Sequence, residues 1–189
     1  RAPAHLHEHC TVLFSDFVGF TKLAEKLEPQ QLVDLIDYCF RGFDEIIDPY
    51  PVEKIKTIGD AYMCVSGLPH EHEQHAQVMV EVALKMRDFM LRLRRDRQLR
   101  DDHYFDVRIG LSSGPVIAGV VGTKKFQYDI WGDTVNTAAR MEQNSEKDRV
   151  NISQSTYGLV KDTSSLYFEP RGSLKVKNKG EMYMYYVDH

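Results

Sequence analysis

The spacing of hydrophobic and polar positions predicts two long helices and a β-hairpin between them. Apolar residues recur at helical spacing over Pro29–Ile47, and a second helical pattern covers Glu73–Arg97. Between these helices, Val52–Ile58 and Ala61–Ser66 are rich in β-branched and aromatic residues. The sequence Gly59-Asp60 joins the two runs and is a strong signal for a tight hairpin turn.

Shorter apolar runs predict the other strands and one more helix. The run Cys10–Asp16 predicts a strand followed by a turn into a helix. Helices and strands mix without strict alternation, so we expect an α+β fold with a mainly antiparallel sheet. The absence of a repeat or linker in the sequence indicates a single domain over residues 1–189. The remaining predicted elements are strands at 104–113, 116–121, 126–131, 174–177 and 182–187, and a helix from 133 to about 144.

Composition and charge exclude several classes of protein. The chain has 189 residues, 42% of them hydrophobic, which is enough for one ordinary core. Lys and Arg number 24 against 28 Asp and Glu, and this net charge of −4 argues against a nucleic-acid binder. Three widely spaced cysteines without a Cys-x-x-Cys pair indicate neither a disulfide framework nor a zinc motif. We therefore expect a reducing compartment, the cytoplasm.

The sequence contains neither a membrane-spanning run nor a signal segment. No apolar stretch approaches the roughly 18 residues that a bilayer span requires. The chain begins Arg1-Ala2-Pro3 without an initiator Met, which suggests an excised or processed domain. We expect an upstream regulatory or membrane-anchoring segment in the full-length protein.

Two acidic residues stand where chemistry is commonly placed. Asp16 ends a predicted strand, and Asp60 lies at the tip of the predicted hairpin. Paired carboxylates beside a glycine-containing turn suit a phosphate site with a divalent metal, because hard oxygen ligands hold Mg²⁺ and backbone N–H groups receive phosphate oxygens. Taken alone, Asp16 is more simply explained as a helix cap and Asp60 as a turn residue.

Four segments decide between these interpretations. Phe14–Thr21 (FSDFVGFT) and Lys56–Tyr62 (KTIGDAY) closely resemble the two metal-binding motifs of class III nucleotidyl cyclases. Tyr128–Gly132 (YDIWG) and Asn136–Arg140 (NTAAR) resemble the base-selecting and transition-state motifs of that family. The resemblance covers about residues 9–187, the expected core of the domain, and the four motifs occur in the family's order.

The resemblance implies a ferredoxin-like α+β catalytic domain that works as a head-to-tail dimer, with active sites in the groove between subunits. Asp16 and Asp60 of one subunit are then expected to bind two Mg²⁺ or Mn²⁺ ions, assisted by the backbone carbonyl of Phe17. The turn that follows is expected to hold the terminal phosphates through the backbone N–H groups around Gly19, Phe20 and Thr21.

Further residues match the family's polar site residues. Asn136 and Arg140, four residues apart on one helix face, are expected to orient the ribose and to stabilise charge on the α-phosphate. Arg108 matches a phosphate-binding arginine, although a structural salt bridge in its strand remains an alternative. Lys179 matches a lysine for the β- and γ-phosphates, and Lys177 is a near-equal candidate.

Two residues indicate the purine. Lys56 can donate to adenine N1 and Asp129 can accept from the adenine amino group, whereas guanylyl members of the family have Glu and Cys at these positions. The resemblance therefore implies an adenylyl cyclase that converts ATP to cyclic AMP. Because one chain carries both the acids and the Asn/Arg pair, we expect a homodimer with two equivalent sites.

Other interpretations remain open. The chain is alternatively a guanylyl cyclase relative with altered or engineered specificity, or a catalytically silent nucleotide-binding regulatory domain. A diguanylate cyclase would share the fold, but its Gly-Gly-Asp/Glu-Glu-Phe hairpin is replaced by Ile58–Ala61. A structural dimerisation module without a nucleotide site is the remaining alternative. The histidines at 5–9 and 70–75 lack the spacing of a zinc helix, and we expect His75 to be a packing residue.

Overall fold

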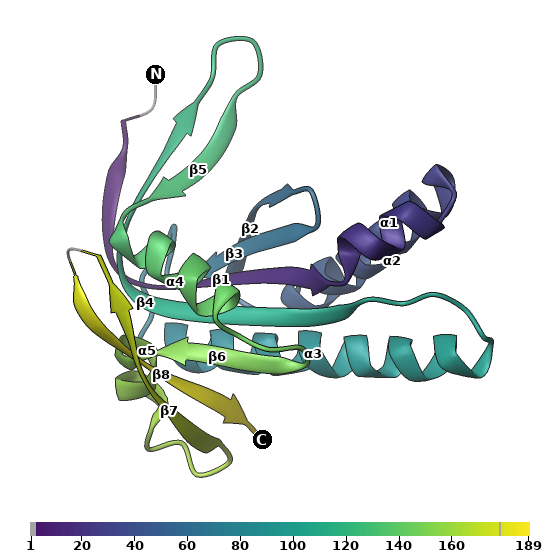
Figure 1. The fold of residues 1–189 in the computed structure, drawn as a ribbon. Helices are drawn as coiled ribbons and strands as arrows, with labels where there is room; N and C mark the ends of the chain where they lie inside the picture. The colour runs from purple at the N-terminus through teal and green to yellow at the C-terminus, as the bar shows by residue number, and fades with distance from the viewer. Residues whose placement is uncertain (1–2, 178) are drawn as a thin grey trace.

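One eight-stranded sheet forms the centre of the computed structural model, which describes residues 3–177 and 179–189 (Figure 1). The strands are β1 (His5–Val18), β2 (Val52–Ile58), β3 (Ala61–Ser66), β4 (Asp106–Val121), β5 (Gln127–Trp131), β6 (Arg149–Ser153), β7 (Tyr167–Val176) and β8 (Gly180–Asp188). Their order is β2-β3-β1-β4-β6-β8-β7, and β5 pairs with β4 outside this path. The β4/β6 pair is parallel, and the other pairs are antiparallel.

Helices cover both faces of the sheet (Figure 1). They are α1 (Phe20–Lys26), α2 (Pro29–Ile47), α3 (His75–Leu99), α4 (Asp133–Gln143) and α5 (Gln154–Val160). Successive strand residues point to opposite faces, so in β1 Leu13 joins the core under α2 and α3, while Val12 joins the core that contains Ala138 of α4. None of the helices in the described parts of the chain is long and apolar enough to cross a bilayer.

The mixed α+β class, the helix at 29–47 and the hairpin of β2 and β3 are confirmed. The second long helix begins at His75 rather than Glu73, and ends at Leu99. The His75 side chain is buried, and its Nδ1 lies 2.8 Å from the Thr11 hydroxyl oxygen, so this histidine is a packing residue as expected.

The prediction of separate strands at 104–113 and 116–121 was wrong, because β4 runs continuously across Pro115. On one side, β1 shifts its register between His7 and Cys10, and Pro115 lies opposite this shift. On the other side, Pro115 lies between the segments of β4 that pair with β6 and with β5. The missing N–H of proline therefore interrupts no described pairing at this position.

The C-terminal region contains more structure than the pattern indicated. Strands β7 and β8 extend beyond the expected 174–177 and 182–187. Helix α5 was not predicted, because seven residues are too few to establish a helical period. The local signal for its start is Ser153, whose hydroxyl accepts a hydrogen bond from the Thr156 N–H.

Candidate active site

Asp16 and Asp60, far apart in the sequence, meet at one end of the sheet. Asp16 lies near the end of β1, opposite Arg108 of β4, and Asp60 lies in the turn between β2 and β3. The backbone N–H of Phe17 donates to Asp16 Oδ1 at 3.0 Å and contacts Asp60 Oδ2 at 3.4 Å. One backbone group therefore connects both predicted metal-binding acids.

The Phe17 side chain anchors this backbone in the core. Its ring stacks on Phe105 with 4.9 Å between centroids and on Phe40 with 5.6 Å. It is almost completely buried, so the main chain between the two acids is held by aromatic packing. The site is thus built on a rigid strand end rather than on a loose loop.

The electrostatics of the acid pair suit a divalent cation. Burial, followed by the hydrogen bond and charge of Asp60 and the charge of Glu142, raises the pKa of Asp16 to about 7. Crowded carboxylates repel each other until a proton or a cation lies between them. The described residues contain no cluster of three or more His, Cys, Asp or Glu side chains arranged for a metal. A cation held by Asp16 and Asp60 therefore needs further oxygens, such as the Phe17 carbonyl or substrate phosphates.

Arg108 lies among these carboxylates. Its Nη2 is 3.6 Å from Asp16 Oδ2 and 3.3 Å from Glu142 Oε2. Arg108, in a central strand, therefore forms ion pairs within this chain, and its phosphate-binding role stays a prediction. Glu142 was not singled out in the sequence analysis, although it follows buried Met141 on the sheet-facing side of α4. An acid beside the buried positions of an amphipathic helix was the available signal.

The expected phosphate turn is short. Gly19 has φ +81°, a left-handed conformation that glycine adopts without strain, and it leads directly into α1. In the described chain, no side chain caps the first turn of α1, so its N–H groups are available to a ligand. The Phe20 ring packs 5.8 Å from that of Phe105, and Thr21 is exposed.

The two predicted base-selecting residues lie together. Lys56 on β2 donates from Nζ to Asp129 Oδ2 on β5 at 2.7 Å. The Lys56 side chain is 25% exposed and that of Asp129 is 13% exposed, so both are reachable but partly desolvated. Asp129 Oδ1 also accepts a hydrogen bond from the backbone N–H of Ile130, which fixes the carboxylate.

Helix α4 carries the other predicted residues on a separate part of the chain. Asn136 is exposed, whereas Arg140 is half-buried. Within residues 3–177 and 179–189, Arg140 Nη1 is buried without a hydrogen-bond partner. Lys179 forms an ion pair with Asp133 in the first turn of α4. No structural contact distinguishes a role for Lys177.

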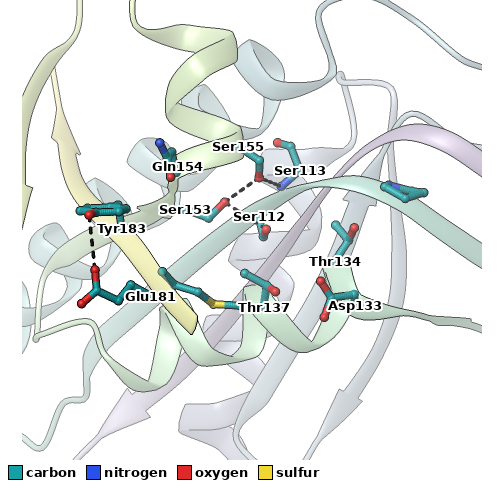
Figure 2. Close-up of a pocket in the computed structure, with 12 residues that line it drawn as sticks. Ser112, Ser113, Asp133, Thr134, Thr137, Ser153, Gln154, Ser155, Glu181 and Tyr183 are labelled. Carbon is teal, nitrogen blue, oxygen red and sulfur yellow. Dashed lines mark hydrogen bonds between the residues drawn. The ribbon is translucent and has the colours of Figure 1, made fainter. Parts of the chain in front are cut away.

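A cavity of about 300 Å³ lies beside α4, but it does not coincide with these groups (Figure 2). Hydroxyl groups dominate its lining, and Ser153 Oγ lies 3.0 Å from Ser112 Oγ and 2.9 Å from Ser155 Oγ. Asp133 lines it, whereas the predicted metal, base and transition-state residues do not. The structure therefore brings together Asp16, Asp60 and Arg108, pairs Lys56 with Asp129, and places Asn136, Arg140 and Lys179 on or beside α4.

Known proteins resemble the chain over nearly its whole length. A family model described as "Adenylate and Guanylate cyclase catalytic domain" matches residues 2–189. The chain is 40% identical over 188 residues to a receptor-type guanylate cyclase of Caenorhabditis elegans, covering 97% of this chain and 14% of the relative. It is 39% identical over 184 residues to an adenylate cyclase of Mycobacterium tuberculosis, covering 97% of this chain and 40% of the relative. The chain thus spans less than half the length of these curated relatives.

Solved structures agree with the sequence relatives. The adenylyl cyclase CyaB from P. aeruginosa superposes with a TM-score of 0.92 at 30% identity, covering 100% of this chain and 97% of that chain. The catalytic core of a rhodopsin-guanylyl cyclase with converted specificity, in complex with ATPαS, gives 0.89 at 34% identity, covering 99% and 98%. Relatives of both nucleotide specificities therefore match. This chain belongs to the class III nucleotidyl cyclases and forms a catalytic domain of the adenylate and guanylate cyclase family.

Proposed function

We propose that this cyclase domain is an adenylyl cyclase that converts ATP to 3′,5′-cyclic AMP and pyrophosphate. The observation that carries the choice of ATP is the half-buried pair of Lys56 and Asp129. Adenine presents an acceptor at N1 and a donor amino group at N6, which match an ammonium donor and a carboxylate acceptor. Guanine presents donors at N1 and N2 and an acceptor at O6, so it would face groups of the wrong polarity.

Desolvation gives this pair its discriminating power. A buried polar group left without a partner costs about 1–3 kcal/mol, and more when it is charged. Lys56 and Asp129 satisfy each other when no base is bound, and adenine can replace those contacts with equivalent ones. Guanine would leave a charged group unpaired at each position, which is why we assign ATP despite the guanylate cyclase relatives.

The acids Asp16 and Asp60 are the residues that would hold Mg²⁺ or Mn²⁺, with the Phe17 carbonyl as a further oxygen ligand. When bound, such ions lower the pKa of the ribose 3′-hydroxyl and neutralise charge on the leaving pyrophosphate. The new bond joins O3′ to the α-phosphorus, the α–β phosphoanhydride bond breaks, and the 3′-hydroxyl proton is released. The uncapped N–H groups at the start of α1 would bind terminal phosphate oxygens.

The remaining groups are assigned to a second copy of the chain. Asn136 would orient the ribose, and Arg140 would stabilise the charge that develops on the α-phosphate. Arg140 Nη1 has no hydrogen-bond partner among the residues that the structure describes, which supports an external ligand for this guanidinium. Since one chain carries both sets of residues, a two-fold dimer contains two equivalent composite sites. Lys179 would reach the β- and γ-phosphates after leaving Asp133.

A reducing, cytoplasmic environment is proposed for the domain. Cys10, Cys39 and Cys64 are free and buried. Burial also raises the pKa of the Cys10 thiol to about 11, which keeps it protonated and unreactive near neutral pH. These properties suit a compartment in which thiols stay reduced.

The direct experiment is incubation of the purified domain with Mn²⁺ and either ATP or GTP, followed by chromatographic identification of the cyclic product. We expect cyclic AMP and pyrophosphate from ATP, with much slower turnover of GTP. Preferential formation of cyclic GMP would contradict the base assignment. Turnover of neither nucleotide, with ATP-dependent thermal protection retained, would instead favour a silent regulatory domain.

A further inference from the structure

Glu142 is the most deeply buried acid at the candidate site, and neither the metal assignment nor the α4 assignment uses it. Its side chain is 9% exposed, on the last turn of α4. A buried carboxylate is costly unless another charge compensates it. The compensating charge is Arg108, whose Nη2 lies 3.3 Å away.

The position of Glu142 is fixed by close packing of α4 on the sheet. A Cβ atom at Gly110 would lie 1.9 Å from the Glu142 backbone nitrogen, so only glycine permits this approach. On the neighbouring strand, Asn151 Nδ2 donates to the Met141 carbonyl at 2.9 Å. These contacts hold the last turn of α4 directly over β4, where Arg108 and Gly110 share one face.

Arg108 connects Glu142 to the predicted metal site. The same nitrogen, Nη2, contacts both carboxylates and is closer to Glu142 than to Asp16, at 3.3 Å against 3.6 Å. Glu142 Oε2 and Arg108 Nε make no hydrogen bond within the described residues, so the contact is an ion pair without hydrogen-bond geometry. The guanidinium is therefore shared between two acids and locked to neither.

This sharing matters because a guanidinium and a divalent cation compete for the same carboxylate. An arginine paired with Asp16 alone would favour a bidentate contact that occupies its oxygens. A second acid that draws Arg108 aside leaves Asp16 oriented and still able to bind a cation. We propose that Glu142 is a positioning residue for Asp16, acting by holding Arg108 so that this arginine steers the metal-binding carboxylate without neutralising it.

This role rests on the proposed metal site and deepens it. It rests on the contacts that Arg108 makes with two carboxylates of its own chain. It also links the two proposed sites of a dimer. Within one chain, Asp16 and Asp60 contribute to one composite site, and Asn136 and Arg140 of α4 contribute to the other. Outer groups that orient a metal ligand typically change metal affinity or activity by 10–100-fold when removed.

The first test measures Mn²⁺ binding to the intact domain by electron paramagnetic resonance of free Mn²⁺, at pH 8.5 and without nucleotide. Glu142→Gln should weaken binding by about tenfold, because the released Arg108 then pairs with Asp16. The double variant Glu142→Gln/Arg108→Gln should regain much of that affinity, since the competing cation is gone. The matched control is Glu45→Gln on the exposed face of α2, which should bind Mn²⁺ like the parent.

Double-variant affinity equal to or below that of Glu142→Gln would overturn the proposal. A gain from Arg108→Gln that is equally large in the parent and in Glu142→Gln would also overturn it, because removal of a nearby cation raises Mn²⁺ affinity even if Glu142 does not hold Arg108. Unchanged binding in Glu142→Gln would also overturn it. Circular dichroism and thermal unfolding identify any variant that fails to fold. In that case Glu142→Asp is compared with Glu142→Gln, both with Arg108 in place. Glu142→Asp keeps the charge on a shorter side chain and must bind Mn²⁺ more tightly.

The second test places the substitution in one chain of a mixed dimer. Chains with Asp16→Ala and chains with Arg140→Ala together form one complete site, whose acids come from the Arg140→Ala chain. Adding Glu142→Gln to that chain should lower the cyclase rate by about tenfold. Adding Glu142→Gln to the Asp16→Ala chain should lower the cyclase rate much less. Equal losses in both arrangements, or a larger loss in the second, would contradict an action on Asp16.

A failure of the proposed function can be distinguished from a failure of the role proposed for Glu142. A mixture of the two parent variants without any activity would contradict the composite site itself. The Mn²⁺ measurements on Glu142→Gln and on the Glu142→Gln/Arg108→Gln double variant would then still decide the role of Glu142, because they require neither nucleotide nor turnover.

Discussion

Two groups of residues at the candidate site differ in how many of their contacts lie within one chain. The acid group comprises Asp16, Asp60, Arg108 and Glu142, and the α4 group comprises Asn136 and Arg140. Asp16 and Asp60 accept from the backbone N–H of Phe17, and Arg108 forms ion pairs with Asp16 and Glu142. On α4, by contrast, Asn136 is exposed and the buried Nη1 of Arg140 has no partner within the described chain. We therefore propose that the first group is one half of a composite site and that the second contributes to the site of a partner chain.

This difference fits the proposed composite site, because the acid group requires more structural support than the α4 group. Like charges concentrated in the acid group must be held by a rigid frame, here the Phe17 ring and the close contact of α4 on Gly110. The α4 group concentrates no like charges, since it combines neutral Asn136 with the single cation Arg140, and it therefore needs less support. If the two groups are halves of one composite site, substitutions in each should lower the cyclase rate, whereas substitutions in the Lys56–Asp129 pair should change the choice of nucleotide.

The largest effect is expected in the acid group. Asp60→Asn removes a metal-binding charge and should lower kcat by about 10³-fold, as expected for the loss of several kcal/mol of metal-dependent stabilisation. The melting temperature should stay equal or rise, because a like charge beside Asp16 is removed. Cyclase assays and calorimetry measure the two effects, with exposed Asp162→Asn as control. A parallel loss of stability and activity would indicate a structural acid instead.

In the α4 group, Arg140→Ala should lower kcat by about 10²–10³-fold, the usual effect of removing one transition-state donor. KM for ATP should change little, because the interaction strengthens as charge develops. Steady-state kinetics provide the measurement, and Arg95→Ala, an exposed arginine on α3, is the matched control. A raised KM with unchanged kcat would show that Arg140 only binds the ground state.

The base pair belongs to neither group and should change which nucleotide is used, not whether catalysis occurs. Lys56→Glu with Asp129→Cys should shift the ratio of kcat/KM toward GTP by roughly 10–100-fold, because the polarity of the hydrogen-bonding groups is reversed. Competition between ATP and GTP with the purified double variant measures this ratio. An unchanged preference for ATP would remove the assignment of these two residues.

The acid group should also bind metal in a pH-dependent way. The Asp16 pKa of about 7 is raised above its ordinary value, so in metal-free protein the protonated form favours folding. Stability without metal should therefore fall as pH rises from about 4 through 7, and Mn²⁺ should restore it. Below pH 7, apparent Mn²⁺ affinity should weaken by about tenfold per pH unit, since one proton must leave. Thermal unfolding with EDTA or Mn²⁺ tests this, and a pH-independent affinity would contradict it.

The smallest effect is expected beside α4. Lys179→Ala should raise KM for ATP by roughly threefold to tenfold, as for the loss of one partly exposed phosphate contact. Lys177→Ala should have a smaller effect on KM, which would settle the choice between the two lysines. The reverse order would assign the phosphate contact to Lys177.

The sequence predicted the positions of Asp16 and Asp60 better than it predicted the packing around them. Asp16 and Asp60 were identifiable because strand ends and hairpin tips are local features with clear residue signals. Glu142 was not, because its importance depends on α4 lying over Gly110, a contact between distant segments. The continuity of β4 through Pro115 was missed for the same reason, since the register shift of β1 opposite it is set by pairing.

The central claim is that the two groups complete each other across a dimer. Its most direct test mixes inactive Asp16→Ala chains with inactive Arg140→Ala chains and measures cyclic AMP formation across mixing ratios. Activity should return and peak at an equimolar ratio, at about a quarter of the parental rate, because half the dimers then carry one complete site of two. Mixtures as inactive as the separate variants, despite dimers of both chains, would contradict the shared site.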